Sequence, residues 1–427
     1  MEEDGKDKFH ERFINLFGFF MFGFTEYVIF AALLTGSQDI LANTQIPTTV
    51  TILFADGPFL LLSLVCPYFI STLSPLARIT GTVICFIFGI LVVALARNMW
   101  WKLTGLSVTS VGYFFVEAGL LPLTAFYSEK TVFAFSGGTG FGLVGTVYYT
   151  VLTTSACVSP RDTLLSAVWL PLIYPAVFYF MDKKLSPSTD HAPYTPLSHT
   201  PYSTSGAPDT TPEESLTGVE KLHIVKSLFV YATTFFLGVA GQYLALGGAV
   251  TTLAFPEGTS GDFAPRDQFV YYATSFAVGE MVGRSYGFLA MCWKHGSRLI
   301  TSHLWLFALL IWINVLFLFF ASWYRFLPSV WIVVAISFFI GLTAGALYCN
   351  AFSLSGKDNV SAVRREFSRA FLVGAFASGL VVGSSLGAVM EYVMRAHCLE
   401  ITDGRYCITR EMKMSNDTLC WKPKHAF

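Results

Sequence analysis

Four carboxylic acids lie in parts of the sequence that are otherwise strongly apolar. They are Glu26, Asp56, Glu117 and Glu280. A charge at the centre of a lipid bilayer is costly, so an acid there faces a bundle interior or an aqueous cavity. These acids are therefore candidates for a pathway that conducts a solute or a proton.

Glu280 has a candidate ion-pair partner in Arg284, which follows it by four residues. Residues four apart lie on one face of a helix, and the acid placed before the base is the favourable order. The pair could serve the structure alone, because a buried salt bridge is weak evidence of function. Asp56 and Glu117 have no basic residue within one helical turn, so we expect them to line the solute or proton pathway.

Other polar side chains could bind a solute beside these acids. Tyr113, Glu117 and Thr124 share one face of a helix by their spacing, and this polar stripe must face inward in a membrane. Tyr348 and Asn350, near the end of another apolar stretch, could hydrogen-bond a solute or a neighbouring helix.

Recognisable motifs of catalysis and of metal binding are missing from the sequence. The 8 histidines form no HExxH motif, and there is no nucleophile elbow. Residues 140–145 match the GxGxxG pattern, but that fingerprint requires a βαβ unit and here it lies in an apolar stretch. We therefore expect no enzymatic activity, no cofactor and no metal. Glycines four apart instead allow close helix packing in a bilayer; they are Gly138 and Gly142, Gly341 and Gly345, and Gly379, Gly383 and Gly387.

The composition shows which solvent surrounds these residues. Hydrophobic residues make up 54% of the 427 residues and charged residues only 13%, whereas about 25% of an ordinary soluble domain is charged. Most of the chain must therefore be surrounded by lipid. The net charge of −1 provides no basic surface for a nucleic acid.

Eleven stretches are long and apolar enough to cross a bilayer, which takes about 20 residues. The first is longer than the apolar region of a signal peptide and has no cleavage site, so we expect it to be retained. The sequence thus predicts an all-α polytopic membrane protein of about eleven transmembrane helices. The expected spans are 13–34, 46–70, 76–96, 103–127, 132–154, 164–181, 226–249, 269–291, 299–323, 328–352 and 367–394.

One polar segment divides these spans into two groups. Residues 182–225 are rich in Ser, Thr and Pro, a composition that predicts a disordered loop, here on the cytosolic side. The loop separates a six-helix half at residues 1–181 from a five-helix half at 226–394, which a tail at 395–427 follows. Two helical halves joined by a long loop are typical of major-facilitator-like transporters, which rock about a central site. A twelfth helix of that pattern is missing.

The distribution of Lys and Arg favours a cytosolic amino terminus, because the loops on that side carry more of them. An odd number of spans then places the tail in the lumen. The tail holds Cys398, Cys407 and Cys420 beside the glycosylation sequon at Asn416, and disulfides and N-glycans need a non-cytosolic compartment. A second sequon at Asn359 falls on the cytosolic side, where we expect it to stay unmodified.

The central loop also contains a candidate sorting signal. Tyr194 and Leu197 have the tyrosine-x-x-bulky spacing that endolysosomal sorting adaptors recognise. Four-residue patterns arise often by chance, and it is the position in a flexible cytosolic loop that favours this one.

Short blocks along the chain resemble the battenin family of lysosomal membrane proteins, and they recur in the family's order. The most specific block is Leu123-Thr124-Ala125-Phe126-Tyr127, which a glycine-rich run at 135–145 follows. Further blocks are Ala55-Asp56, Thr163-Leu164-Leu165-Ser166, Arg284-Ser285, Phe326-Leu327-Pro328-Ser329, Tyr348-Cys349-Asn350 and Arg365-Glu366-Phe367.

The resemblance implies a multi-pass protein of the lysosomal membrane with a facilitator-like fold. It further implies a role in exporting glycerophosphodiesters and in lysosomal pH and amino-acid homeostasis. Glu26 and Glu280 have no clear counterpart in the family. The residues that match the family pattern by position are Asp56, Glu117, Tyr272, Arg284, Tyr348 and Asn350.

Two departures from the family limit what the resemblance implies. Ser63 lies where the family carries a lysine, so a mechanism that needs that cation does not transfer. Lys424 lies where the family's prenylation motif has its cysteine, so lipid anchoring of the tail does not transfer either.

Three functions remain compatible with the sequence. The first is a lysosomal transporter of a small, anionic polar solute, with possible proton coupling. The second is a non-transporting regulator of lysosomal trafficking, which would need only surface motifs. The third is a nucleoside-type carrier, because equilibrative nucleoside carriers also have eleven helices and a long central loop.

Overall fold

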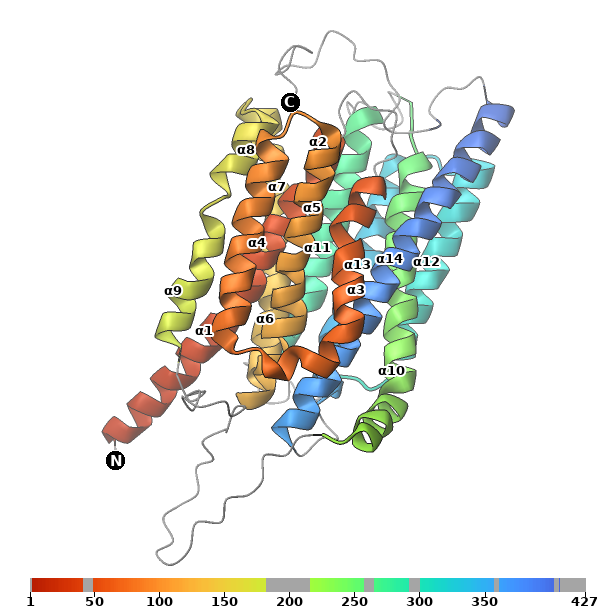
Figure 1. Cartoon of the computed structure of the whole chain (residues 1–427). Coiled ribbons are helices and arrows are strands. Elements are labelled where there is room, and N and C mark those ends of the chain that lie inside the picture. The colour runs from red at the N-terminus through yellow and green to blue at the C-terminus, as the bar shows by residue number, and fades with distance from the viewer. Residues whose placement is uncertain are drawn as a thin grey trace, which may run out of the picture.

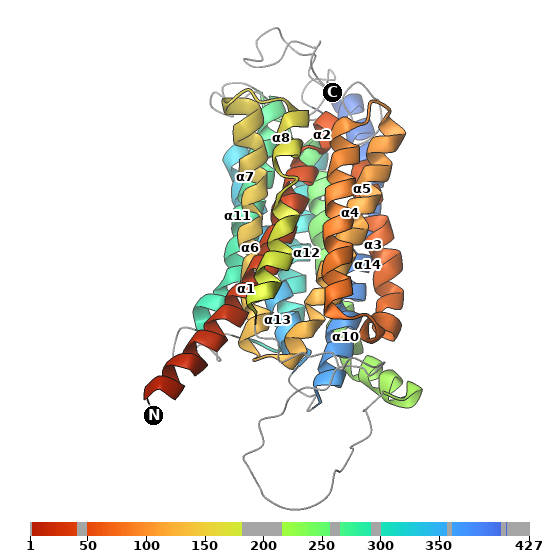
Figure 2. The same cartoon turned by 60° about the vertical axis from the view of Figure 1, so that its left-hand side comes forward.

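The computed structural model describes residues 2–40, 49–181, 216–256, 265–291, 300–356, 361–402 and 407. Every regular element in these residues is helical. Figures 1 and 2 show the long helices side by side in one bundle, with α1 continuing beyond the others at the end where it begins. The predicted all-α class is confirmed.

The helices of the amino-terminal half are interrupted at several places. Its elements are α1 (Glu2–Thr35), α2 (Ser37–Ile40), α3 (Thr49–Phe69), η1 (Ile70–Thr72), α4 (Pro75–Leu95), α5 (Met99–Phe114), η2 (Phe115–Leu120), η3 (Pro122–Phe126), α6 (Lys130–Gly142), α7 (Val144–Thr150), η4 (Val151–Ser155), α8 (Pro160–Ser166), η5 (Leu170–Leu172) and α9 (Ile173–Phe180).

The helices of the carboxyl-terminal half have fewer interruptions. Its elements are α10 (Gly218–Leu244), η6 (Ala245–Ala249), η7 (Val250–Thr252), α11 (Pro265–Met291), α12 (Leu304–Tyr324), α13 (Val330–Leu354) and α14 (Ala362–Ile401). We call the end at which α1 and α10 begin the lower end, and the end at which α14 finishes the upper end (Figure 1). The first and last long helices thus have their outer ends on opposite sides, as an odd number of crossings requires.

Nine stretches of the described residues are long and apolar enough to cross a membrane. The expected span at 132–154 is not among them, and its helix is interrupted at Leu143, between α6 and α7. The expected span at 269–291 is α11, which is long enough but carries Glu280 and Arg284. Both segments nevertheless run along the bundle: α6 and α7 pack beside α1, and α11 packs beside α6 and α13 (Figure 2).

Local capping explains where several helices begin. Ser74 accepts a hydrogen bond from the Ala77 amide and precedes Pro75, which suits the first turn of α4. Thr217 and Glu220 form a reciprocal capping box at the start of α10. This helix therefore begins at Gly218, inside the segment 182–225 that the composition predicts to be loop, and α14 likewise extends beyond residue 394 to Ile401.

Small residues let the helices of each half approach closely, as the glycine spacing predicts. A Cβ on Gly138 of α6 would collide with the carbonyl oxygen of Phe20 in α1. A Cβ on Gly341 of α13 would collide with that of Phe276 in α11. The two halves meet where α3 packs on α14 and α6 packs on α11.

A change of helix type marks the fourth crossing. After α5 the backbone becomes a π-helix over Phe115–Leu120 and then a 3₁₀-helix over Pro122–Phe126. Single π-helical turns occur often at functional sites, and this one contains the buried acid Glu117.

Candidate functional site

The guanidinium of Arg284 is the centre of a buried polar cluster between the two halves. Arg284 lies in α11 and is 1% exposed. Its Nε and Nη2 donate to Oε1 of Glu280 at 2.9 and 2.7 Å, which confirms the pair predicted from their spacing. Its Nη1 donates to Thr139 Oγ1 of α6 at 3.0 Å, so the same side chain also joins the other half.

Two tyrosine rings enclose this guanidinium. The ring centroid of Tyr348 in α13 lies 4.0 Å from Cζ of Arg284, and that of Tyr27 in α1 lies 4.4 Å away. Stacking of a guanidinium on aromatic rings is favourable and holds its plane in one orientation. Tyr27 and Thr139 were not among the residues singled out from the sequence, because only the packing of α1, α6 and α11 places them here.

Glu117 joins the cluster through Tyr348. The Tyr348 hydroxyl donates to Oε1 and Oε2 of Glu117 at 3.0 and 2.9 Å. Tyr348 belongs to the carboxyl-terminal half and Glu117 to the amino-terminal half, so this bond crosses the interface between the halves. Glu117 is 2% exposed, and its position in the π-helix turns its side chain toward that interface.

Glu26 of α1 adds a third acid to the cluster. It is 1% exposed, and it interacts electrostatically with both Glu117 and Arg284. Its Oε2 has no hydrogen-bond partner among the described residues. The cluster therefore contains three acids and one base, and so has acidic oxygens available to a solute hydroxyl, a cation or a proton.

Asp56 of α3 lies apart from Arg284, beside a narrow cavity. The cavity, of about 10 Å³, is lined by Asp56, Tyr113 and mostly apolar residues of α1, α3 and α5, and it has room for about one water molecule. Neither Oδ2 of Asp56 nor the hydroxyl of Tyr113 has a hydrogen-bond partner within the described part of the chain. Tyr113, which lines the cavity, interacts electrostatically with both Asp56 and Glu26.

Two further expected residues are not part of the cluster. The Tyr272 hydroxyl donates to the Leu253 carbonyl at 3.1 Å, within the carboxyl-terminal half. Asn350 accepts from the Thr301 amide at 2.9 Å and donates to Ala346 and Tyr286. Both side chains hold neighbouring segments of one half together, which is the alternative role expected for Asn350.

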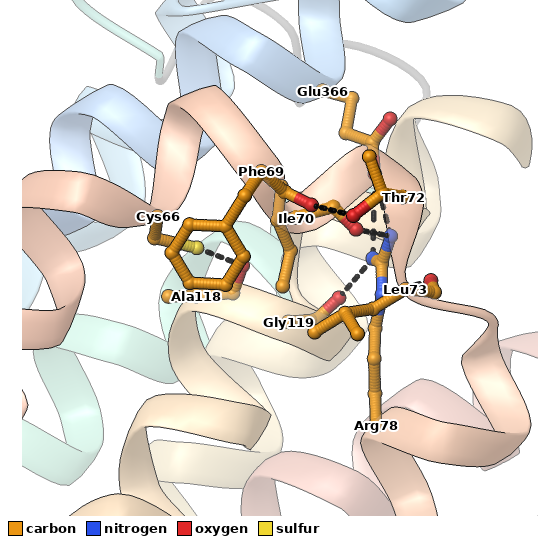
Figure 3. A network of polar contacts seen from close by, with 9 residues as sticks. All are labelled: Cys66, Phe69, Ile70, Thr72, Leu73, Arg78, Ala118, Gly119 and Glu366. Carbon is orange, nitrogen blue, oxygen red and sulfur yellow. Dashed lines mark hydrogen bonds and ion pairs between the residues drawn. The ribbon is translucent and has the colours of Figure 1, made fainter.

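A second ionic network closes the lower end. Arg78 of α4 is fully buried, and its Nη2 lies 3.2 Å from Oε1 of Glu366 in α14. Figure 3 shows Arg78 reaching past the carbonyls of Ile70 and Gly119 toward Glu366. Those carbonyls each accept from Arg78 at 2.6 Å. The guanidinium thus joins α4, η1 and η2 of one half to α14 of the other.

The upper end carries disulfide bonds. Cys398, in the last turn of α14, is bonded to Cys407. Cys157, in the segment between η4 and α8, is disulfide-bonded as well. Tyr194, Leu197 and Asn416 lie outside the described residues. Among the residues that are described, no three His, Cys, Asp or Glu side chains are grouped as metal ligands would be.

Comparison with known proteins identifies relatives along nearly the whole chain. The family model described as CLN3 protein matches residues 17–397. Protein BTN1 of Kluyveromyces lactis is 29% identical over 393 residues, covering 91% of this chain and 95% of that protein. Battenin of Canis lupus familiaris is 27% identical over 409 residues, covering 88% and 89%.

Solved structures show the fold. The transporter FucP in the outward conformation aligns with a TM-score of 0.56 at 13% identity, covering 90% of this chain and 97% of that chain. The human organic anion transporter MFSD10 aligns with a TM-score of 0.59 at 11% identity, covering 93% and 96%. A bacterial homolog of the human lysosomal transporter Spinster, inward-facing and unoccupied, aligns with a TM-score of 0.56 at 12% identity, covering 92% and 85%. The chain therefore has a major-facilitator fold, and the similarity at these identities extends to the fold alone.

Proposed function

The chain belongs to the CLN3 protein family, and we propose that it exports glycerophosphodiesters across an endolysosomal membrane. The family and the fold make it a multi-pass membrane protein of transporter type. The proposal concerns its solute and its compartment. Changes in lysosomal pH and in amino-acid content would then be consequences of this export.

The observation that carries the proposal is the position of Arg284. A cation buried at 1% exposure within the membrane-spanning bundle, at the interface of two rocking halves, lies where facilitator-like proteins bind their solutes. Its bonds to Glu280 and Thr139 use three of the five N–H donors of the guanidinium. The planar fork of arginine suits the two free oxygens of a phosphodiester.

The acids beside Arg284 suit the remainder of such a solute. A glycerophosphodiester carries several hydroxyl groups, and carboxylate oxygens accept hydrogen bonds from hydroxyls. Glu26 offers an oxygen without a hydrogen-bond partner, and Glu117 is held at the interface by Tyr348. Glu280 would hold the guanidinium while the site is empty and would share it with the phosphate when the solute arrives.

Proton coupling would use acids that form no direct ion pair among the described residues. Asp56 and Glu117 lie on neighbouring helices, and Tyr113 interacts electrostatically with both Asp56 and Glu26. Buried acids and tyrosines in such a series can pass a proton between them. We propose that a proton from the acidic lumen reaches Glu117 along this route and leaves with the solute.

Transport by rocking requires that bonds between the halves break and form. In this structure the Arg78–Glu366 pair joins the halves at the lower end, while Arg284–Thr139 and Tyr348–Glu117 join them at the centre. We propose that opening of the lower end separates α4 from the first turns of α14 and releases the solute to the cytosol. The carboxyl-terminal tail then lies in the lumen, and the segment before α10 lies in the cytosol.

The test is uptake by the purified full-length protein in proteoliposomes with an imposed pH gradient. Labelled glycerophosphodiester should enter the vesicles with the wild type and not with Arg284→Gln, while Arg284→Lys should retain part of the rate. Uptake of labelled uridine in place of the phosphodiester would support the nucleoside carrier. Uptake of neither solute, with normal lysosomal trafficking in cells that express Arg284→Gln, would support the non-transporting regulator.

A further inference from the structure

Four charged residues lie in the first turns of α14, at the lower end of the interface between the halves. Two of them are paired with opposite charges. Glu366 binds Arg78 of α4, and Arg364 lies 2.7 Å from Glu220 at the partly exposed start of α10. The other two, Arg365 and Arg369, have no such partner among the described residues.

Arg369 is a buried cation whose hydrogen-bond partner among the described residues is a neutral group. It is 2% exposed, its Nη1 donates to Thr124 Oγ1 at 2.8 Å, and its Nε has no hydrogen-bond partner in the described part of the chain. Arg365, one turn earlier, donates to the Ala125 carbonyl at 2.9 Å, and its Nε likewise has no partner within the residues that the structure describes. The other arginines buried in the bundle differ, since Arg78 and Arg284 each contact a carboxylate.

Burial of a guanidinium without a counter-charge is unfavourable, and a like charge one turn away adds repulsion. Glu129 is the acidic residue that interacts electrostatically with Arg369, but it is exposed and forms no ion pair with it within the described residues. Gly356 faces Arg369 from the end of α13, and a Cβ there would lie 3.1 Å from Nη2. The site therefore has N–H donors in excess of acceptors.

We infer that Arg365 and Arg369 form a second anion-binding site, which takes a phosphate group when the lower end opens. The two guanidinium groups lie one turn apart beside the amino-terminal end of α14, where the helix dipole also favours an anion. The acceptors that now occupy them, Thr124 and Ala125, belong to η3 of the other half. Separation of the halves removes these neutral acceptors and leaves the donors facing the opening.

The phosphate could come from the transported solute on its way out or from a lipid headgroup in the adjacent leaflet. Both sources present the same charged oxygens to the two arginines. Identification of the solute rests on the proposed function, whereas the site itself does not, because a headgroup would bind even if the protein transported nothing.

Direct binding to the purified full-length protein tests the inference. The probes are glycerol 3-phosphate in detergent solution and nanodiscs with or without phosphatidylinositol 4-phosphate. Arg369→Gln should weaken the binding of whichever probe occupies the site by about tenfold or more, as expected for loss of a charge-assisted donor. Arg364→Gln is the matched control, since it removes the same charge from the start of the same helix at a partly exposed pair, and it should leave binding unchanged.

Phosphate binding at this site should depend on whether the lower end is open, and this dependence provides a second measurement. The site is buried in the closed lower end, so apparent affinity is reduced by the fraction of molecules that are closed. Glu366→Gln removes the ion pair that closes this end and should therefore tighten phosphate binding in the presence of Arg369. Binding that is equal in the wild type and Arg369→Gln, or that Glu366→Gln leaves unchanged, would overturn the inference. Loss of binding in Arg284→Gln but not in Arg369→Gln would assign the phosphate to the central cluster alone.

Discussion

The hydroxyl of Tyr348 and the carboxylate of Glu117 form a bond that joins the two halves at the centre of the bundle, at 2.9 and 3.0 Å to the two carboxylate oxygens. Both side chains are almost completely buried. Tyr348 also stacks on Arg284, so one tyrosine positions the acid of one half against the base of the other. The relationship predicts that transport depends on a single hydroxyl group.

Tyr348→Phe should lower the rate of solute uptake by about tenfold while the ring remains stacked on Arg284, because only one hydrogen bond to a charged group is lost. Tyr272→Phe is the matched control. Its hydroxyl bonds the Leu253 carbonyl within one half, and its removal should leave the rate within about a factor of two. Equal rates in both variants in proteoliposomes would exclude the Glu117 bond from the mechanism.

Arg284→Ala and Glu117→Gln should each abolish phosphodiester export, and Glu117→Gln should also remove any dependence on the proton gradient. Removal of Arg284 alone leaves Glu280 buried without its partner. Breaking a buried pair in this way lowers the free energy of unfolding by about 3–5 kcal/mol. The double variant Glu280→Gln with Arg284→Gln avoids that cost. We expect it to restore protein abundance but not export.

The contrast between single and double variants separates structure from function. Normal export in the double variant would mean that the pair only holds helices together. Abundance is measured by quantitative blotting of lysosomal membranes, and export by labelled phosphodiester at equal protein amounts.

The spacing of residues along the sequence predicted which side chains lie on the same face of one helix. The Glu280–Arg284 pair and the glycines that admit a neighbouring helix follow from a periodicity of 3.6 residues. The capping box of Thr217 and Glu220 was not singled out from the sequence. The Ser-, Thr- and Pro-rich composition around it favoured a loop there, so the start of α10 was placed too late.

Contacts between the halves could not be derived in this way. Tyr348 and Glu117 are 231 positions apart, and Arg78 and Glu366 are 288 apart. Which helix faces pack against each other depends on how all the helices are arranged. A single sequence shows that a helix has a polar face, but it does not show which other helix that face contacts. For the same reason the sequence did not show that Asp56 of α3 lies beside a cavity lined with Tyr113.

The topology gives a prediction about glycosylation. Asn416→Gln should increase the electrophoretic mobility of the mature protein, because the tail follows α14 at the upper end, where Cys398 and Cys407 form a disulfide. Asn359→Gln should have no effect, since that sequon follows α13 at the lower end. Detection of a glycan on Asn359 would mean that the true orientation is the opposite of the one proposed.

The sorting signal is tested by a double substitution in the central loop. Tyr194→Ala with Leu197→Ala should reduce the lysosomal fraction and increase the amount at the cell surface. His191→Ala with Ser198→Ala changes the same segment outside the motif and serves as the control. Unchanged co-localisation with a lysosomal marker in quantitative imaging would make the motif incidental.

Cys66 can report opening of the lower end. Its thiol is fully buried in α3 and donates to the Ala118 carbonyl at 3.4 Å, next to the Gly119 carbonyl that accepts from Arg78 (Figure 3). A thiol in this position reacts with a maleimide only after α14 moves away from α3 and α4. The Arg78–Glu366 pair opposes that movement, so its removal should increase labelling.

We therefore predict that Glu366→Gln labels at Cys66 several-fold faster than the wild type, while Arg364→Gln, which breaks the partly exposed pair with Glu220, labels at the wild-type rate. Cys85 and Cys349 are also free thiols, so the same variants with Cys66→Ser identify the signal that belongs to Cys66. Added glycerophosphodiester should change the rate further in the wild type, because a solute that binds one conformation shifts the population of both. Slow labelling of Cys66 in Glu366→Gln, with normal folding by size-exclusion chromatography, would mean that the apolar contacts of α3 with α14 close this end without the ion pair.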